Sequence, residues 1–182
     1  MELTIFKRKK GDSKKLLRQG GIPGVLYSKG KESENIYIEK DKFAAILRAT
    51  KTGRLSTLVF ELKDGKKKIK AILKDIQYHL TSYDIIHVDF QILDDKTPVK
   101  VKIPIECINV ADCVGVKLGG VLRQVIRHLK VRCLPKDMPE EFVLDVKDLS
   151  MADDKRLKDI EIPKNVYPLG QMDEVAVVIA KR

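Results

Sequence analysis

The chain has 182 residues, a length that allows one large or two small domains. Of these residues 43% are hydrophobic and 34% are charged, which is the composition of a folded protein and excludes a disordered tail. No apolar run approaches the ~18 residues of a membrane span, and the first residues lack the apolar stretch of a signal peptide. Residues 1–93 carry 20 Lys+Arg and 11 Asp+Glu, a balance of +9, whereas residues 94–182 carry 16 and 15, a balance of +1.

The excess positive charge begins in a run from Lys7 to Arg18, which holds seven basic residues (Lys10 among them) and one acid. A short helix over residues 14–18 is expected within it. Because nearly all the net charge lies in the amino-terminal half, this pattern favours contact with a polyanion over the alternative of a solvated loop.

The next segments of this half predict strands around one clear helix. Residues 36–39 and 57–62 are rich in β-branched and aromatic side chains and are expected to be strands. Between them, Asp41 can cap a helix over residues 42–49, where three apolar side chains fall on one face: Phe43, Ile46 and Leu47. Asp64-Gly65 is a strong two-residue hairpin signal between alternating segments.

Turn residues and the change in charge place a domain boundary near residues 94–98, which predicts domains over 1–94 and 95–182. In the second half, residues 99–105, 142–146 and 174–180 are expected to be strands. Pro104 cannot donate a ladder hydrogen bond, which favours an edge position for its strand. The prediction is a mostly β protein with minor α content, in two domains, the first with one or two helices.

The segment from Ile85 to Leu93 predicts a strand with two different faces, because alternate residues of a strand point to opposite sides. An apolar set should face the core: Ile86, Val88, Phe90 and Ile92. The other face carries His87, Asp89 and Gln91, three side chains that form hydrogen bonds. An ordinary solvent-facing surface is the alternative interpretation.

The preceding segment favours nucleic-acid binding. Its apolar residues Ile69, Ala71 and Leu73 should be buried, and its lysines should lie on the opposite side: Lys66, Lys68, Lys70 and Lys74. If the two strands are neighbours, the lysines, which attract phosphates, lie beside the polar side chains of the next strand, which can reach the edges of bases. A carboxylate such as Asp89 would accept a hydrogen bond from a guanine amino group in the shallow minor groove of RNA.

Catalysis and metal binding are weaker alternatives. His87 and Asp89 could hold a metal, but a nuclease needs more carboxylates or a nucleophile with its base, and no phosphate-binding glycine loop occurs. The spacing of Cys107, Cys113, His128 and Cys133 does not fit a zinc site. The odd cysteine count favours free thiols in a reducing cytosol. We therefore expect no catalytic residue, no metal, no cofactor and no small-molecule substrate.

At these residues the chain resembles the bacterial large-subunit ribosomal protein family numbered twenty-five, in its long form, the general stress protein Ctc family. The similarity runs over essentially the whole chain. It is carried by Gly21-Ile22-Pro23-Gly24-Val25-Leu26-Tyr27, Lys74-Asp75-Ile76-Gln77-Tyr78-His79, Ile86-His87-Val88-Asp89-Phe90, Gly115-Val116-Lys117-Leu118-Gly119-Gly120-Val121-Leu122 and the segments 134–139 and 145–149.

The resemblance implies a six-stranded barrel-like amino-terminal domain that binds 5S ribosomal RNA at an internal loop, in the central protuberance of a cytoplasmic ribosome. It also implies a β-rich second domain, whose near-neutral charge favours protein contacts or weak RNA contact. Other partners would be neighbouring large-subunit proteins and ribosomal RNA. A stress-induced RNA-binding protein or RNA chaperone that acts away from the ribosome is the alternative function.

The expected contact residues come from the basic run, which supplies Lys14 and Lys15, and from the same resemblance, which supplies the others. Phosphate contacts are expected of Arg8, Lys14, Lys15 and Arg18, and contacts to sugars and base edges of Tyr27, Gln77, His87 and Asp89. The family's second arginine falls on Leu17, with Arg18 one residue later, and Ser28 and Leu80 replace a glycine and a proline. In a regular strand Gln77 would share the buried side of Ile69, so its RNA contact requires a bulge.

Overall fold

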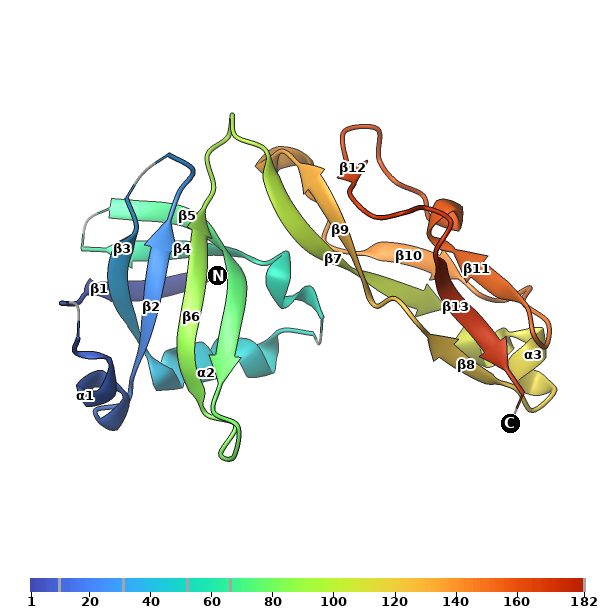
Figure 1. Cartoon of the computed structure of the whole chain (residues 1–182), viewed down its shortest axis with the longest axis horizontal. Coiled ribbons are helices and arrows are strands. Elements are labelled where there is room, and N and C mark those ends of the chain that lie inside the picture. The colour runs from blue at the N-terminus through green and yellow to red at the C-terminus, as the bar shows by residue number, and fades with distance from the viewer. Residues whose placement is uncertain (10, 31, 52, 66, 182) are drawn as a thin grey trace. The chain divides into compact units, whose positions relative to one another are not determined.

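The computed structural model describes residues 1–9, 11–30, 32–51, 53–65 and 67–181. The chain divides into two compact units, Met1–Thr97 and Pro98–Arg182 (Figure 1). Strands dominate both units, and the helices are short or few. The prediction of a mostly β protein with two β domains is confirmed.

The amino-terminal unit is a closed six-stranded barrel in which the strands follow the order β1-β3-β2-β6-β5-β4. The β1–β4 and β2–β6 pairs are parallel, and the other pairs are antiparallel. The expected six-stranded barrel is therefore confirmed. Its strands are β1 (Glu2–Lys7), β2 (Gly21–Tyr27), β3 (Glu34–Glu39), β4 (Val59–Asp64), β5 (Lys67–Tyr78) and β6 (Ile85–Ile92).

Three helical segments connect these strands: α1 (Ser13–Arg18), α2 (Lys40–Ala49) and η1 (Arg54–Ser56). The short helix α1 and the apolar face of α2 are as predicted, since Phe43 is fully buried and both Ile46 and Leu47 pack against the core. The predicted cap is wrong, because α2 begins at Lys40 after Glu39. Asp41 instead lies in the first turn, where a carboxylate favours the helix dipole.

The barrel is closed around apolar side chains that alternate along every strand. Phe43, Phe60 and Phe90 meet at its centre, with the rings of Phe60 and Phe90 5.5 Å apart in an edge-to-face arrangement. Such a packed centre fills the interior of a small barrel with side chains. Ligand recognition is therefore left to the outer surface of the strands.

The β4–β5 hairpin forms where predicted, with Asp64 paired to Lys67 and Gly65 at a φ of 58°. Such positive φ angles favour glycine. Lys66, which belongs to the predicted row of lysines, lies outside the described residues.

Irregular pairing between β5 and β6 decides which side chains face outward. The register jumps from Leu73 to Asp75, so that Gln77 pairs with His87. This bulge supplies the change of face that Gln77 needs. A second register shift, between Gln77 and Tyr78, reverses the sides to which the first residues of β6 point. Ile85 therefore packs against the core and Ile86 does not, so the prediction that Ile86 faces the core is wrong.

The second unit contains a four-stranded sheet of order β10-β7-β9-β12 and a three-stranded sheet of order β11-β13-β8. Its strands are β7 (Val99–Ile108), β8 (Val121–Gln124), β9 (His128–Cys133), β10 (Phe142–Asp145), β11 (Asp154–Arg156), β12 (Tyr167–Pro168) and β13 (Val175–Ala180). The short helices are α3 (Val114–Lys117), η2 (Val110–Asp112), η3 (Pro135–Asp137) and η4 (Leu157–Asp159). The three strands predicted for this half correspond to β7, β10 and β13.

The edge position predicted for Pro104 is wrong, because β7 lies between β10 and β9. The proline is nevertheless tolerated for a local reason. Pairing with β10 begins only at Ile105, while the part of β7 from Val99 to Pro104 pairs with β9. Pro104 thus lies just before the point at which the strand becomes internal, where its missing N–H costs no ladder bond.

Candidate RNA interface

Polar side chains gather on the outer surface of β2, β6 and β5. Because residues paired across a sheet point to the same side, Gln77 lies beside His87 and Asp75 beside Asp89. On the parallel β2–β6 side, Val25 neighbours Asp89 and Tyr27 neighbours Gln91. We call this surface the polar face, which comprises Tyr27, Asp75, Gln77, His87, Asp89 and Gln91.

The predicted two-sided character of β6 is confirmed at its centre. Val88 and Phe90 are fully buried in the barrel, whereas His87, Asp89 and Gln91 are half-buried on the outside. The polar groups therefore stand on a rigid strand whose inner side is fixed by packing. Such support favours precise placement of groups that contact a ligand.

His87 and Asp89 meet on this face. The distance from His87 Nδ1 to Asp89 Oδ1 is 2.8 Å, which is that of an ion pair when the imidazole is protonated. Asp89 Oδ1 is covered by protein and accepts no hydrogen bond from the part of the chain that the structure describes. The side chain as a whole is 33% exposed, so its other oxygen, Oδ2, is the one that a donor outside the protein can reach.

Tyr27 and the two carboxylates influence one another. Burial, followed by the negative charges of Asp89 and Asp75, raises the pKa of the Tyr27 hydroxyl above its usual value. The hydroxyl therefore stays protonated and can donate a hydrogen bond at neutral pH. Alternation along a regular β5 does not place Asp75 here, and only the bulge at Lys74 brings it beside Asp89.

Arg8 follows β1 and lies across the neighbouring strands. Its Nε donates to the Ile36 carbonyl at 2.9 Å, one Nη to Ser13 Oγ at 3.3 Å and the other to the Gly24 carbonyl at 3.4 Å. Gly24 is paired with Val88 of β6. The half-buried guanidinium thus joins β3, β2 and the start of α1, one strand away from the polar face, and orders this side of the barrel.

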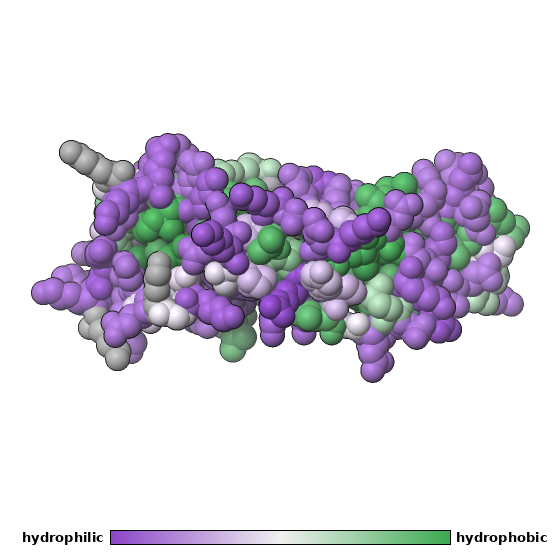
Figure 2. Space-filling view, turned by 90° about the horizontal axis from the view of Figure 1, so that it is seen from above, coloured by the Kyte–Doolittle hydropathy of each residue, from purple (hydrophilic) through white to green (hydrophobic). Residues whose placement is uncertain are grey.

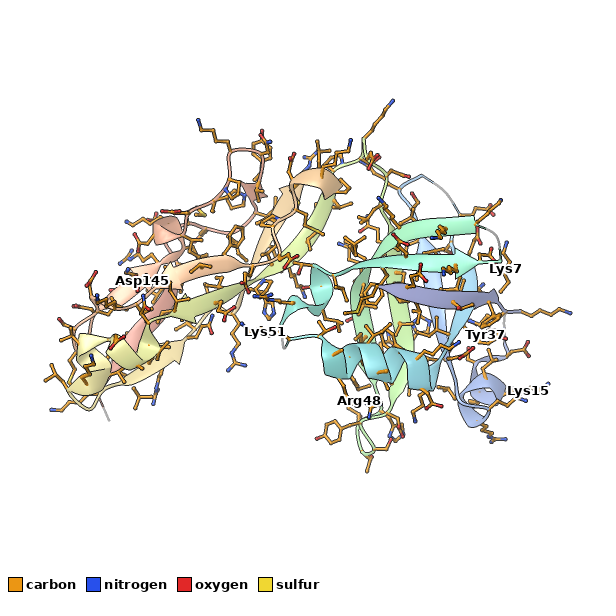
Figure 3. The ribbon with its side chains drawn as sticks, turned by 180° about the vertical axis from the view of Figure 1, so that it is seen from behind. Lys7, Lys15, Tyr37, Arg48, Lys51 and Asp145 are labelled. Atoms are coloured by element: carbon orange, nitrogen blue, oxygen red, sulfur yellow. The ribbon has the colours of Figure 1, made fainter. Side chains whose placement is uncertain are left out.

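The other predicted cations stand on α1. Lys14, Lys15 and Arg18 are exposed, and Figure 3 shows Lys15 pointing from α1 into solvent. Helix α1 packs against β2, the strand that carries Tyr27 of the polar face and lies next to β6. Positive charge therefore lies on one flank of the face. Lys10, which belongs to the same basic run, is outside the described residues.

The lysines of β5 do not form the predicted ladder beside His87. Lys68 and Lys70 lie toward the opposite end of β5, paired with Lys63 and Glu61 of β4. Lys68 is also within 3.7 Å of Glu2 and 3.9 Å of Glu61. The predicted association of β5 and β6 is correct, and Lys74 is the member of the predicted row that lies at the bulge next to Asp75 of the polar face.

The described parts of the chain contain three cysteines and no cluster of side chains that could hold a metal. No group of three or more His, Cys, Asp or Glu side chains there could hold a metal, and no helix among them is long and apolar enough to cross a membrane. Cys107, Cys113 and Cys133 are free thiols, as predicted, and the last two are buried. Burial raises the pKa of both Cys107 and Cys133, which keeps their thiols protonated.

The comparisons with known proteins agree with this architecture. Residues 3–90 match the Ribosomal L25p family, and residues 98–182 match the family described as Ribosomal protein TL5, C-terminal domain. Together with the barrel and its polar outer face, these matches define the class as ribosomal proteins.

Full-length relatives narrow the class to one family. The proteins named large ribosomal subunit protein bL25 from Chlamydia abortus and Chlamydia trachomatis serovar D are 48% identical to the chain, and that from Chlamydia pneumoniae is 45% identical. Each alignment spans 185 positions and covers 100% of both sequences. The chain belongs to the bL25 family of large-subunit ribosomal proteins, which confirms the resemblance found in its motifs.

Proposed function

We propose that this chain binds 5S ribosomal RNA through the polar face and serves as a non-catalytic structural component of the large subunit, in the central protuberance of a cytoplasmic ribosome. The relatives' name, large ribosomal subunit protein bL25, supports assembly into that subunit. Neighbouring ribosomal proteins and ribosomal RNA are its further partners. Within this proposal, the polar face reads the minor groove of an internal loop.

The observation that carries the proposal is the placement of Asp89 on the outer side of β6, where its side chain is 33% exposed while Oδ1 is covered, so that Oδ2 is the oxygen an outside donor can reach. In A-form RNA the minor groove is wide and shallow and exposes 2′-hydroxyls and guanine amino groups. Both are hydrogen-bond donors, and a carboxylate can only accept. Asp89 therefore suits a guanine amino group, while its repulsion of phosphates disfavours the backbone.

The remaining residues divide into two roles. Tyr27, Gln77 and His87 stand next to Asp89 and contact sugars and base edges. The contact with Asp89 engages Nδ1 of His87 and leaves Nε2 for RNA. Lys14, Lys15 and Arg18 attract phosphates from α1, and these contacts fix orientation without reading sequence. Arg8 orders the strands between the two groups and offers its remaining N–H groups to a phosphate.

Replacing Asp89 by Ala tests the role in base recognition. The variant should bind 5S ribosomal RNA more weakly by about 1–3 kcal/mol, the usual effect of losing one good contact to a base. Its affinity for a random RNA duplex should not fall, because removal of a negative charge favours any RNA. The measurement is a titration of the full chain with each RNA at one fixed salt concentration.

Glu32→Ala is the matched control, since it removes one exposed carboxylate of the same unit and changes the net charge equally. This control should bind both RNAs at least as tightly as the wild type. Wild-type binding of Asp89→Ala to 5S ribosomal RNA would contradict the proposal. Equal binding of the unaltered chain to every RNA would instead indicate a general RNA-binding protein.

A further inference from the structure

The second unit carries a concentrated positive surface that its near-neutral total charge conceals. Along the β7–β9 pair, Val99, Val101, Ile103, Leu129, Val131 and Cys133 are buried on one side. The residues between them point to the other side, where Lys100 pairs with Arg132 and Lys102 with Lys130. All four of these cations are exposed. His128 follows them at the next outward position of β9.

The surroundings of His128 on this surface shift the pKa of its imidazole. Desolvation of the ring and the positive charges of Lys102 and Arg127 lower it below its usual value. The lowered pKa favours the neutral imidazole, first because the ring is desolvated and then because Lys102 and Arg127 are nearby. The register of β7 and β9 concentrates four cations on one side of the sheet, and such a concentration of positive charge attracts a polyanion. Glu106 ends this row along β7.

A groove of about 690 Å³ opens beside the cations. Tyr167 of β12 is the register partner of Arg132, so the row from Lys100 through Arg132 ends on an exposed aromatic ring. Leu134, Tyr167 and Leu169 give the groove apolar walls, and Asn165 and Asp137 add hydrogen-bonding groups. On the side of this unit where β12 lies, Figure 2 shows green hydrophobic side chains bordered by purple hydrophilic ones.

We infer that this surface binds single-stranded RNA, with phosphates on the β7–β9 cations and one unstacked base in the groove against Tyr167. Cations beside an exposed aromatic ring are the combination that binds single strands, because phosphates satisfy the charge and a base stacks on the ring. Asn165 and Asp137 can bond to the edge of that base. A duplex keeps its bases stacked and cannot fill the groove, and an acidic peptide has no base to stack.

This second site is separate from the polar face, and its test uses the full chain with a fluorescent single-stranded RNA of twelve nucleotides, a length of about one to three binding modules. Lys130→Gln combined with Arg132→Gln should weaken binding at least about ten-fold and reduce the slope of log affinity against log salt by about 1.4. Tyr167→Ala should weaken binding about ten-fold, the effect of one lost base stack, and leave the salt slope unchanged.

Lys117→Gln combined with Lys158→Gln is the matched control. It removes the same two charges from lysines of α3 and η4 that are ion-paired with Asp112 and Asp173. Binding by this control should remain near that of the wild type. A loss as large as that of the β9 pair would overturn the inference, because it would mean that total charge alone governs binding.

Ultraviolet cross-linking with peptide mapping provides a readout that charge cannot mimic. The RNA should cross-link to Tyr167, and Asp89→Ala should leave that cross-link intact, which separates this site from the proposed 5S contact. Cross-links confined to residues 1–97 would overturn the inference. Displacement of the RNA by polyglutamate and a duplex as effectively as by unlabelled single strand would overturn it too, since any polyanion would then fit.

Discussion

Asp89 has one covered carboxylate oxygen in a side chain that is one-third exposed, and the covered oxygen has a cost in the folded protein. An enclosed acceptor without a hydrogen bond costs about 1–3 kcal/mol, and Asp89 Oδ1 is in this condition. The nearby imidazole of His87 offsets part of the cost through its 2.8 Å contact. Because Oδ1 is covered, a donor from RNA would meet the exposed Oδ2 instead, and the cost of the covered oxygen remains with the folded protein.

His128 allows a pH test of the second positive surface. Its NMR titration midpoint should lie below 6.5, because desolvation, Lys102 and Arg127 all disfavour the imidazolium. A lowered folded-state pKa means that His128 contributes stability above the unfolded pKa and loses it as pH falls through the folded one. Lys102→Gln should raise the midpoint, with His128→Gln used to assign the signal. A midpoint at or above 6.5 would show that the cations do not act on this ring.

At the scale of elements, the sequence predicts strands well and their irregularities poorly. Periodicity identifies the buried centre of β6, where Val88 and Phe90 face inward. It fails at Ile86, because the register shift arises from pairing with β5 and leaves no mark on the alternation of β6. The sequence does not predict Asp75 on the polar face for a similar reason, because only the bulge in β5 places it there. The family resemblance required a bulge for Gln77, which the structure contains.

Helix α1 is the element expected to supply the charge-dependent part of binding. Lys14→Gln and Lys15→Gln should each weaken binding to every RNA alike and flatten the salt dependence by about one unit, because each lysine releases one counterion. The measurement is the slope of log affinity against log salt. Lys42→Gln on α2, whose ammonium lies 2.9 Å from Glu39, is the control with the same charge change. Identical slopes for the α1 variants and the wild type would exclude phosphate contact by this helix.

At the scale of the whole molecule, charge counts predict the proposed RNA surface of the amino-terminal unit and miss the positive surface of the second unit. Residues 94–182 carry 16 basic and 15 acidic residues, which suggests a neutral partner surface. Pairing of β7 with β9 sorts four of the cations onto one side of a sheet. The alternation is visible in Val99-Lys100-Val101-Lys102, but the pairing that aligns it with β9 depends on contacts between distant parts of the chain.

Chemical footprinting of total ribosomal RNA with the full chain directly tests whether the polar face recognises 5S ribosomal RNA. One helix of 5S ribosomal RNA should be strongly protected, on its minor-groove side. This protection should be lost with Asp89→Ala and kept when Lys130 and Arg132 are both replaced by Gln. Protection spread over many helices, or a 5S footprint that Asp89→Ala leaves unchanged, would contradict recognition through the polar face.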